Sequence, residues 1–324
     1  MSPTRVQRVL VIQPAFLGDV VFTSALVDAL AERCEVDVCV TPRGRDAALA
    51  MPRAAQVLVF DKGGEDRGPL GLLRAARRIA LRGHDAAVLP HVSLRSALLA
   101  RLSRIPRRIG FRGAPGSLFY TERVPVAGRA VLEREAALAS ALGAAARPMR
   151  IAVRPEWDPG PLPDRFVAFC LGSEWETKMW PPERFAALAD ELQARGLTPV
   201  LLGAGRERPL AEAVQRSARA PCLDTTGNPI GEAIAILSRA RLCVGGDSGL
   251  VHAARALGVP TVALFGPTSP DALAFAGRQR AVSLGLDCSP CSDHGQRRCP
   301  LGHHRCLRDL DAERVARECD AVLA

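Results

Sequence analysis

Short apolar runs alternate with amphipathic stretches along almost the whole chain of 324 residues. A buried parallel strand needs a short apolar run, and the crossover helix that joins two such strands needs one apolar face. The alternation therefore predicts an α/β fold with parallel sheets. In the first half the expected strands are residues 9–13, 35–40, 56–60, 86–89 and 107–110, and the expected helices are residues 20–32, 70–81, 94–102 and 132–142.

A proline-rich stretch, RPEWDPGPLPD at residues 154–164, interrupts this pattern and predicts a linker, because its four prolines disfavour both helix and sheet. We therefore expect an N-terminal domain of residues 1–153 and a second domain of residues 165–308. We expect a final helix in residues 309–324, capped by Asp309 or Asp311. One expectation is that this helix packs back on the N-terminal domain. The second domain restarts the pattern with strands expected at residues 166–171, 199–202, 242–245 and 261–265, and helices at residues 182–195, 208–216, 231–238 and 249–257.

The charge of the chain is strongly basic. Its formal net charge is +9, and arginine carries nearly all of the positive charge because Lys62 and Lys178 are the only lysines. This balance favours anionic partners, namely phosphorylated ligands, an anionic membrane face or nucleic acid. One tyrosine and three tryptophans offer few stacking platforms, so we expect no nucleic-acid partner. The apolar N-terminal run is broken by Pro14, Gly18 and Asp19 and fits neither a signal peptide nor a membrane span, which indicates a cytoplasmic protein.

Two segments that follow predicted strands carry charged residues suited to binding or catalysis. Ligands of doubly wound sheets bind at the carboxyl ends of the strands. The segment PAFLGD, residues 14–19, places Asp19 at the start of a helix, where the plain alternative is a helix cap. The segment of residues 171–185 carries Lys178, a compact positive charge for phosphate oxygens or, alternatively, a solvated surface lysine.

A third segment, residues 244–270, combines a strand, a glycine turn and a helix start. Ser248 and Gly249 begin that helix, whose free N–H groups are suited to an anion. His252 on its first turn is either a ligand contact or a packed core histidine. The string GDSG here is not the nucleophile loop of a serine protease, because Leu250 replaces the second glycine and the α/β pattern is wrong. No strand is followed by G-x-G-x-x-G, and G-x-x-x-x-G-K-[ST] is also missing from the sequence.

Together these segments resemble the heptosyltransferase family, glycosyltransferase family 9, whose members transfer heptose from ADP-heptose to the lipopolysaccharide inner core. The resemblance rests on VLVIQPAFLGDVVFTSAL, KMWPPERFAALADEL and GDSGLVHAARALGVPTVALFGPTSP, in this order. The tail SPCSDHGQRRCPLGHHRCLRDLDAERV looks most like the heptosyltransferase II subgroup. The resemblance implies a GT-B architecture, in which two Rossmann-like domains with parallel sheets face a central cleft. It also implies that the first domain binds the acceptor and the second the nucleotide sugar.

The resemblance implies residue roles by position. Asp19 matches the family's proposed general base, and Lys178 matches its donor-phosphate lysine. Glu207 is the nearest candidate for an acidic residue that contacts ribose, and its role stays open. An inverting transfer needs a base for the acceptor hydroxyl and positive charge for the leaving diphosphate, which a lysine and a helix N-terminus can supply with no cofactor required for catalysis. The further donor-binding positions are Ser173, Asp247, Ser248, Gly249 and His252.

The acceptor implied by the resemblance is the lipid A-core glycolipid. Arginines near residues 101–112 are candidate contacts for this acceptor or for the membrane, and the alternative is a solvated helix end and loop. They are Arg101, Arg104, Arg107, Arg108 and Arg112. No segment is amphipathic enough to insert into a bilayer, so we expect peripheral contact at the inner face of the inner membrane. A family member with another nucleotide sugar or acceptor, and a non-catalytic nucleotide-binding protein, remain alternatives.

Four cysteines near the C-terminus have the spacing C-x2-C-x7-C-x6-C. A C-x2-C pair can direct two sulfurs at one ion, which makes the cluster a candidate structural site for zinc or iron. The alternative is a set of reduced thiols or a disulfide, because the second pair is spaced more widely than in zinc ribbons. These residues are Cys288, Cys291, Cys299 and Cys306.

Overall fold

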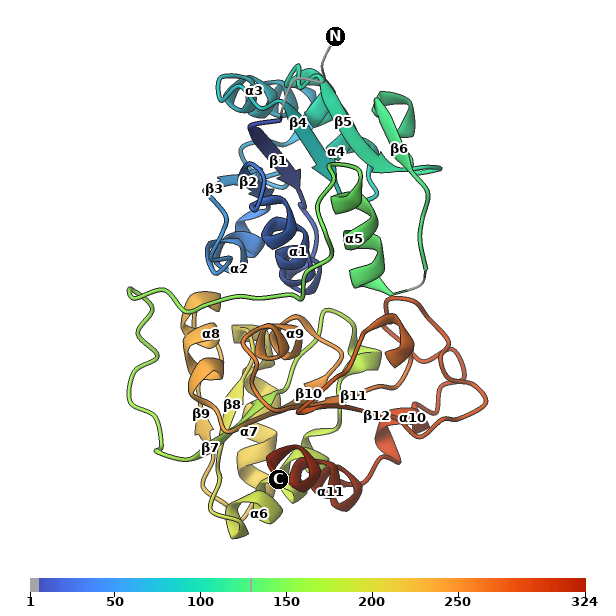
Figure 1. Cartoon of the computed structure of the whole chain (residues 1–324). Coiled ribbons are helices and arrows are strands. Elements are labelled where there is room, and N and C mark those ends of the chain that lie inside the picture. Colours follow the sequence, from blue (N-terminus) through green and yellow to red (C-terminus); the bar gives the residue numbers. More distant parts are fainter. Residues whose placement is uncertain (1–5, 129) are drawn as a thin grey trace. The chain divides into compact units, whose positions relative to one another are not determined.

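Two six-stranded sheets organise the chain, and the strands within each sheet are parallel to their neighbours. The computed structural model describes residues 6–128 and 130–324. The chain divides into two units, Met1–Ala152 and Val153–Ala324, each built around one sheet (Figure 1). The division falls beside the proline-rich stretch, and residues 151–165 contain neither helix nor strand. The α/β class with two Rossmann-like sheets is therefore confirmed.

The first sheet has the strand order β3-β2-β1-β4-β5-β6, which is the Rossmann order. The direction of winding reverses between β1 and β4. Its strands are β1 (Arg8–Ile12), β2 (Glu35–Val40), β3 (Gln56–Val59), β4 (Ala86–Leu89), β5 (Arg107–Phe111) and β6 (Glu122–Val124). Its helices are α1 (Leu17–Leu30), α2 (Arg45–Leu49), α3 (Gly68–Ala80), α4 (Leu94–Leu102) and α5 (Val131–Ser140), with short 3₁₀ turns η1 (Pro42–Gly44) and η2 (Ser117–Phe119).

The second sheet repeats this topology in the order β12-β11-β10-β7-β8-β9, and its winding reverses between β7 and β10. Its strands are β7 (Phe166–Cys170), β8 (Thr198–Leu202), β9 (Leu223–Asp224), β10 (Leu242–Gly246), β11 (Thr261–Leu264) and β12 (Gln279–Val282). Its helices are α6 (Pro182–Ala194), α7 (Arg208–Ser217), α8 (Ile230–Arg239), α9 (Gly249–Ala256), α10 (Arg305–Arg308) and α11 (Ala312–Leu323). Its 3₁₀ turns are η3 (Glu176–Lys178), η4 (Gly205–Glu207) and η5 (Pro270–Ala272).

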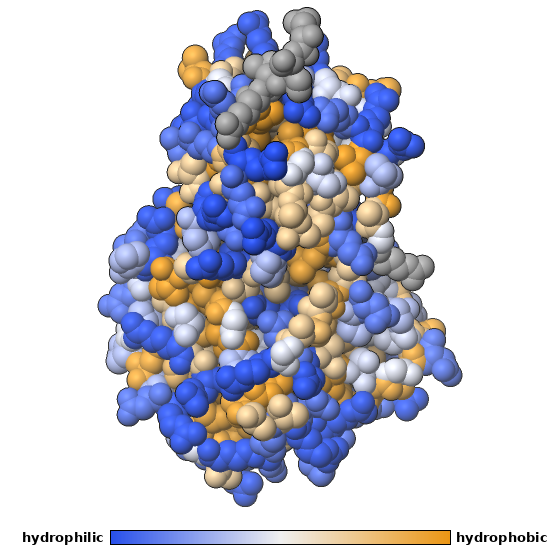
Figure 2. Space-filling view, in the orientation of Figure 1, coloured by the Kyte–Doolittle hydropathy of each residue, from blue (hydrophilic) through white to orange (hydrophobic). Residues whose placement is uncertain are grey.

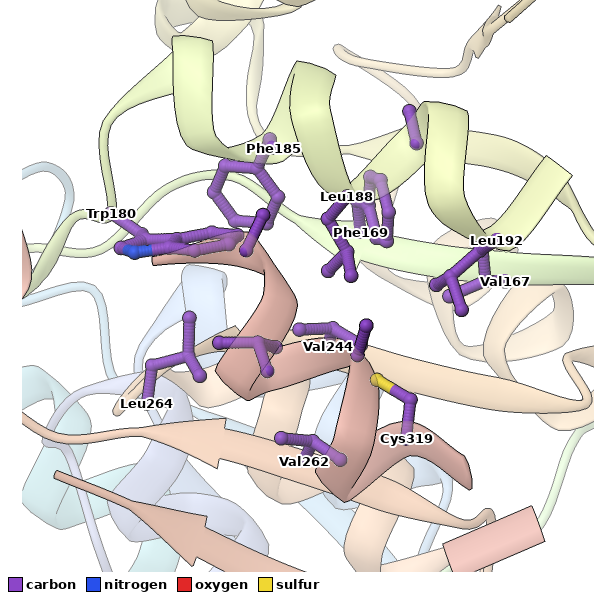
Figure 3. Close-up of a cluster of buried hydrophobic side chains, with 14 of the residues drawn as sticks. Val167, Phe169, Trp180, Phe185, Leu188, Leu192, Val244, Val262, Leu264 and Cys319 are labelled. Carbon is purple, nitrogen blue, oxygen red and sulfur yellow. The ribbon is translucent and has the colours of Figure 1, made fainter. Parts of the chain in front are cut away.

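The core of the second unit brings its sheet together with helices α6 and α11 (Figure 3). Phe169 of β7 lies 5.3 Å from Phe185 of α6, and Trp180 meets Phe185 edge-on at 4.9 Å between ring centroids. Burial of such a side chain contributes about 1.5–3 kcal/mol. Cys319 of α11 belongs to the same cluster. The C-terminal helix is therefore part of the second unit and contributes to its core.

The helices and strands expected from the sequence are all present, with bounds that differ by at most three residues. Asp311 is the N-cap of α11, where its carboxylate accepts the N–H of Arg314 at 2.7 Å. The helices and strands that the sequence did not predict are α2, α10, β6, β9 and β12. These three strands are short and only partly buried, because all three lie at sheet edges and all carry polar residues.

Candidate active site

The candidate residues of each unit lie at the point where their own sheet reverses its winding. In such sheets the loops after the two central strands diverge and leave room for a ligand. Residues 14–19 follow β1 of the first sheet. Lys178 follows β7 and Asp247 follows β10 of the second sheet. These predicted residues thus lie at the carboxyl edge of the sheet in their own unit.

Lys178 and Asp247, 69 positions apart in sequence, form an ion pair in the second unit. Lys178 Nζ lies 2.6 Å from Asp247 Oδ2, and the two side chains are only 12% and 11% exposed. The hydroxyl of Thr268 donates to the same oxygen at 2.9 Å. His252 Nε2 lies 2.9 Å from the other oxygen, Oδ1. The structure therefore brings together three residues that the sequence placed at the donor, Lys178, Asp247 and His252, and adds Thr268.

The electrostatics of this group favour an ionised Asp247. Burial alone raises the pKa of Asp247, but the hydrogen bond with His252 and the charge of Lys178 outweigh it and hold the pKa well below its usual range. Burial lowers the pKa of His252 despite the neighbouring carboxylate. A neutral His252 that donates its Nε2–H to an ionised Asp247 is consistent with the lowered pKa of both residues. Asp247 thus fixes the ammonium of Lys178 in place while the ammonium keeps two further N–H groups for another anion.

The N-terminus of α9 lies directly beside this ion pair. Ser248 is the N-cap residue, but its side chain does not cap the helix, and its buried hydroxyl has no partner among the described residues. The first N–H groups of an α-helix have no acceptor within the helix. The start of α9, including Gly249, therefore presents donors and a partial positive charge next to Lys178. This geometry is suited to a phosphate or diphosphate.

A glycine at the end of β10 allows the two halves of this site to approach. A β-carbon at Gly246 would lie 2.1 Å from the carbonyl oxygen of Lys178. The turn η3, which carries Lys178 and which we call the lysine turn, would be pushed away from β10 by any other residue at this position. The sequence indicated a tight turn here but not this contact, because the partner lies in a distant segment.

Ser173 and Glu207 lie near the ends of β7 and β8. Ser173 is 8% exposed, and its carbonyl oxygen accepts a hydrogen bond from Arg206 at 3.2 Å. Both carboxylate oxygens of Glu207 are used locally, since one accepts the N–H of Ala204 and the other the Nε–H of Arg206, each at 2.6 Å. Glu207 therefore closes its own loop in this structure, and no open carboxylate faces a ribose from this position.

Asp19 lies in the first turn of α1, but it is not the N-cap. The helix begins at Leu17 with Phe16 as N-cap, so Asp19 is its third residue. The cap position expected for Asp19 is therefore wrong, because the helix starts three residues earlier than the sequence indicated. A carboxylate in the first turn is still favoured by the helix dipole.

A buried polar network lies beneath this turn. The hydroxyl of Thr23 lies 3.0 Å from the carbonyl oxygen of Asp19, 2.9 Å from Gln13 Nε2 and 3.2 Å from Glu135 Oε1. The amide nitrogen only donates, and the single hydroxyl proton of Thr23 cannot serve both the Asp19 carbonyl and Glu135. All three contacts are satisfied together when Glu135 carries a proton and donates it to Thr23. Burial, followed by the charge of Asp19, raises the pKa of Glu135 to about 8 against the opposing effects of Thr23 and Arg134. Sequence reasoning missed this acid.

Two further cations at the carboxyl edge of the first sheet were also missed. Lys62 Nζ donates to the carbonyl oxygen of Pro14 at 2.7 Å, next to the loop that leads to Asp19. Arg95 lies 5.1 Å over the ring of Phe60 and donates to the Lys62 carbonyl oxygen at 3.2 Å. Burial, with the charge of Arg95, lowers the pKa of Lys62. The rarity of lysine in this chain was the signal that could have identified Lys62.

The predicted arginine cluster does not form one patch. Arg107 begins β5 and Arg112 follows its end, so these two lie at opposite edges of the sheet, about 16 Å apart at 3.3 Å per residue. Arg107 pairs with Glu122 of β6 at 2.7 Å, and Arg108 donates to the carbonyl oxygen of Phe119 at 2.7 Å. Arg101, Arg104 and Arg112 are exposed. Of the five arginines, Arg112 is the one at the edge that carries Asp19.

The four C-terminal cysteines lie close enough to influence one another. The charges of Cys288, Cys291 and Cys299 act on the thiol of Cys306, although burial is the largest influence on its raised pKa. Among the described residues, however, no three His, Cys, Asp or Glu side chains are arranged to hold a metal ion. All ten cysteines are free thiols. The side chains as they stand do not fit the metal site that the spacing suggested.

Within residues 6–128 and 130–324, no helix is long and apolar enough to cross a membrane. On the face shown in Figure 2, hydrophilic and apolar side chains are interspersed. The most exposed large apolar residues are Leu70, Leu81 and Leu118 in the first unit and Leu301 in the second.

Comparison with known proteins places the chain among sugar-transferring enzymes. The family model of glycosyltransferase family 9 (heptosyltransferase) matches residues 72–301. The chain is 27% identical to lipopolysaccharide heptosyltransferase 2 of Salmonella typhimurium, over 98% of this chain and 99% of that protein. Among solved structures, it resembles a family 9 glycosyltransferase of Veillonella parvula with a TM-score of 0.87 at 22% identity, covering 100% of this chain and 98% of that one. It also resembles ADP-heptose lps heptosyltransferase II of E. coli with a TM-score of 0.80 at 23% identity, covering 98% of both chains. The iron-containing dodecameric glycosyltransferase TibC of enterotoxigenic E. coli shares the fold at a TM-score of 0.63 and 16% identity, over 99% of this chain and 80% of that one.

Proposed function

The chain belongs to glycosyltransferase family 9, the heptosyltransferase family, and on that basis we propose that it moves heptose from ADP-heptose to the lipopolysaccharide inner core as a heptosyltransferase II-like enzyme. The observation that carries this proposal is the buried Lys178–Asp247 pair beside the N-terminus of α9. Its relatives named lipopolysaccharide heptosyltransferase 2 align with nearly the full length of the chain, which supports the heptose donor and the lipopolysaccharide acceptor.

On the donor side, the diphosphate of ADP-heptose binds at Lys178 and the first turn of α9. Lys178 offers two N–H groups beyond its bond to Asp247, and Ser248 offers a hydroxyl with no partner among the described side chains. As the bond between the sugar and the diphosphate breaks, negative charge gathers on ADP. Fixed positive groups stabilise that charge more in the transition state than in the bound donor. Ser173 lies after β7, at the same edge of the sheet, and completes the donor contacts.

On the acceptor side, Asp19 acts as the general base. Its carboxylate takes the proton of the acceptor hydroxyl while that oxygen bonds to the anomeric carbon and ADP leaves on the opposite face, which inverts the anomeric configuration. The first turn of α1 favours the ionised carboxylate that this step requires. Lys62, Arg95 and Arg112 lie at the same edge of the first sheet and are suited to an anionic acceptor.

The experiment that tests the function measures release of ADP and product mass for purified protein with a panel of nucleotide sugars and defined lipopolysaccharide acceptors. We expect turnover with ADP-heptose and an acceptor that lacks the next inner-core heptose. Turnover with another nucleotide sugar alone would assign the chain a different substrate within the family. Binding of ADP without turnover of any donor would favour a non-catalytic nucleotide-binding protein instead.

The acceptor is a lipid, so we also propose peripheral contact with the inner face of the inner membrane. The exposed Arg101 and Arg104 are suited to anionic headgroups, because they lie beside exposed apolar residues such as Leu102. Co-sedimentation with vesicles that contain anionic lipid tests this contact. Equal binding to neutral vesicles would contradict it.

A structural metal at the cysteine loop, which we define as residues 287–306, is a separate proposal. The C-x2-C spacing and the mutual proximity of Cys288, Cys291, Cys299 and Cys306 support it, and TibC, which shares the fold, is an iron-containing protein. The present side-chain arrangement does not form a site, so zinc or iron binding requires the thiols to reorient. We assign the metal no part in the transfer reaction.

A further inference from the structure

The cysteine loop lies against the turn that carries the donor lysine. Thr177, the residue before Lys178, is only 4% exposed. Its N–H and its hydroxyl both donate to the carbonyl oxygen of Gln296, at 3.1 and 2.7 Å, and the N–H of Gln296 donates back to the hydroxyl at 2.8 Å. One hydroxyl proton and one lone pair are thus used in a reciprocal pair that joins the loop to the lysine turn.

Two further residues of the loop contact the same turn. His304 Nε2 donates to the carbonyl oxygen of Thr177 at 2.8 Å, from a backbone with φ +49° that few non-glycine residues adopt. Gly295, at φ +91°, leaves room for the lysine, because a β-carbon there would lie 2.9 Å from Cε of Lys178. The methylene stem of Lys178 therefore rests directly on the loop.

The cysteine loop also contacts a second segment that reaches Asp247, namely Pro267 and Thr268. The carbonyl oxygen of Pro267 accepts the N–H groups of Cys291 at 2.9 Å and Ser292 at 3.0 Å. Thr268 comes next in the chain, and its hydroxyl donates to Asp247 Oδ2 at 2.9 Å. The same carboxylate oxygen pairs with Lys178. The loop is therefore bound to both segments that converge on this oxygen.

We propose that the cysteine loop is the positioning element of the diphosphate site, and that Thr177, Gln296 and His304 fix the Lys178 ammonium for the donor. This inference rests on the proposed role of Lys178 in donor binding. A lysine side chain loses up to about 2 kcal/mol of rotamer entropy when it is held in one conformation. Contacts that hold the lysine side chain in place before the donor binds remove most of this entropy loss from the binding step. The contacts involved are main-chain, hydroxyl and imidazole contacts, so the role requires no metal.

The test compares Thr177→Val with Thr177→Ser and with a matched control, Thr261→Val. Thr261 is a fully buried threonine of the same unit whose hydroxyl donates to the carbonyl oxygen of Val259 at 2.7 Å, at the opposite edge of the sheet. Affinity for ADP is measured by calorimetry, and steady-state kinetics separate the two substrates. Thr177→Val should weaken ADP binding and raise the donor KM about tenfold, the scale of one buried hydrogen bond, with the acceptor KM unchanged. Thr177→Ser should restore both, and Thr261→Val should lower the melting temperature without changing ADP affinity.

A second variant covers the case in which Thr177→Val does not fold. Asn tolerates the left-handed backbone of residue 304 but is too short to reach the Thr177 carbonyl oxygen, so His304→Asn should weaken ADP binding in the same direction. Wild-type ADP affinity in the folded variants would overturn the positioning role while leaving the proposed function intact. Failure of the wild-type protein to bind ADP would instead remove the premise, and the positioning role with it.

Discussion

The buried acid Glu135 should make the first unit less stable as the pH rises. Its pKa is raised from 4.5 to about 8 in the folded chain. Below pH 4.5 the carboxyl is protonated in the folded and the unfolded chain, so it adds no pH dependence. Between 4.5 and 8 the unfolded chain ionises while the folded chain keeps its proton, which favours unfolding by about 1.4 kcal/mol per pH unit. Above the folded pKa both states are ionised and the effect levels off.

Glu135→Gln removes this titration while keeping the shape of the side chain and a donor for Thr23. At pH 5 the variant and the wild type should unfold with free energies within about 1 kcal/mol of each other, the scale of one hydrogen bond. At pH 7 the variant should be more stable by up to roughly 3 kcal/mol, and at pH 8 by up to roughly 5 kcal/mol. Glu133→Gln is the matched control, because Glu133 is exposed on the same helix.

The assay must report on the first unit alone. Tryptophan fluorescence cannot do this, because Trp157, Trp175 and Trp180 all lie in the second unit. Amide hydrogen exchange of peptides from α1 and α5 reports the opening free energy of these helices directly. Comparing variant and wild type at one pH cancels the intrinsic exchange rate. A Glu135→Gln advantage that stays constant from pH 5 to pH 8 would refute a protonated Glu135.

The site residues give three further predictions. Asp19→Asn should lower turnover by about a hundredfold or more, the scale of a lost general base, with ADP affinity retained; near-normal kcat would contradict the assignment, and Asp28→Asn at the other end of α1 serves as control. Lys178→Ala should weaken ADP binding and lower kcat. Arg195→Ala is the control, because it removes an ion-paired surface cation of the same unit, and it should change neither quantity. Elemental analysis of protein purified without a metal column should find about one zinc or iron per chain if the cysteine loop binds metal, and a value far below one would rule this out.

The strands could be predicted because a central parallel strand is buried on both faces and must be apolar along its length. Edge strands escape this rule, which is why Glu122–Val124 gave no apolar run. Glu135 was missed for a related reason. It shares the buried face of its helix with Leu138 and Ala139, but a single acid within an amphipathic pattern is normally read as solvated. Its position three residues before Leu138 was the available signal.

Residues that are close in sequence were wrongly expected to be close in space where the chain forms a strand. Arg107 and Arg112 are five positions apart, yet a strand carries them to opposite edges of the sheet. The reverse holds for Lys178 and Asp247, which are far apart in sequence and 2.6 Å apart in space. Residue type identified the lysine and the acid as candidates, but only the strand order of the sheet, which brings β7 beside β10, could show that they are partners.

Gly246 shows why two motifs that look independent are one site. In sequence it belongs to the glycine turn after β10, and turn chemistry alone would explain it. In the structure its missing side chain makes room for the carbonyl oxygen of Lys178, which a β-carbon would approach to 2.1 Å. The requirement for glycine is therefore imposed by the lysine turn, 68 positions earlier in the chain. Gln296 and His304 hold the lysine turn on its other side, so contacts from three separate segments place the ammonium against Asp247.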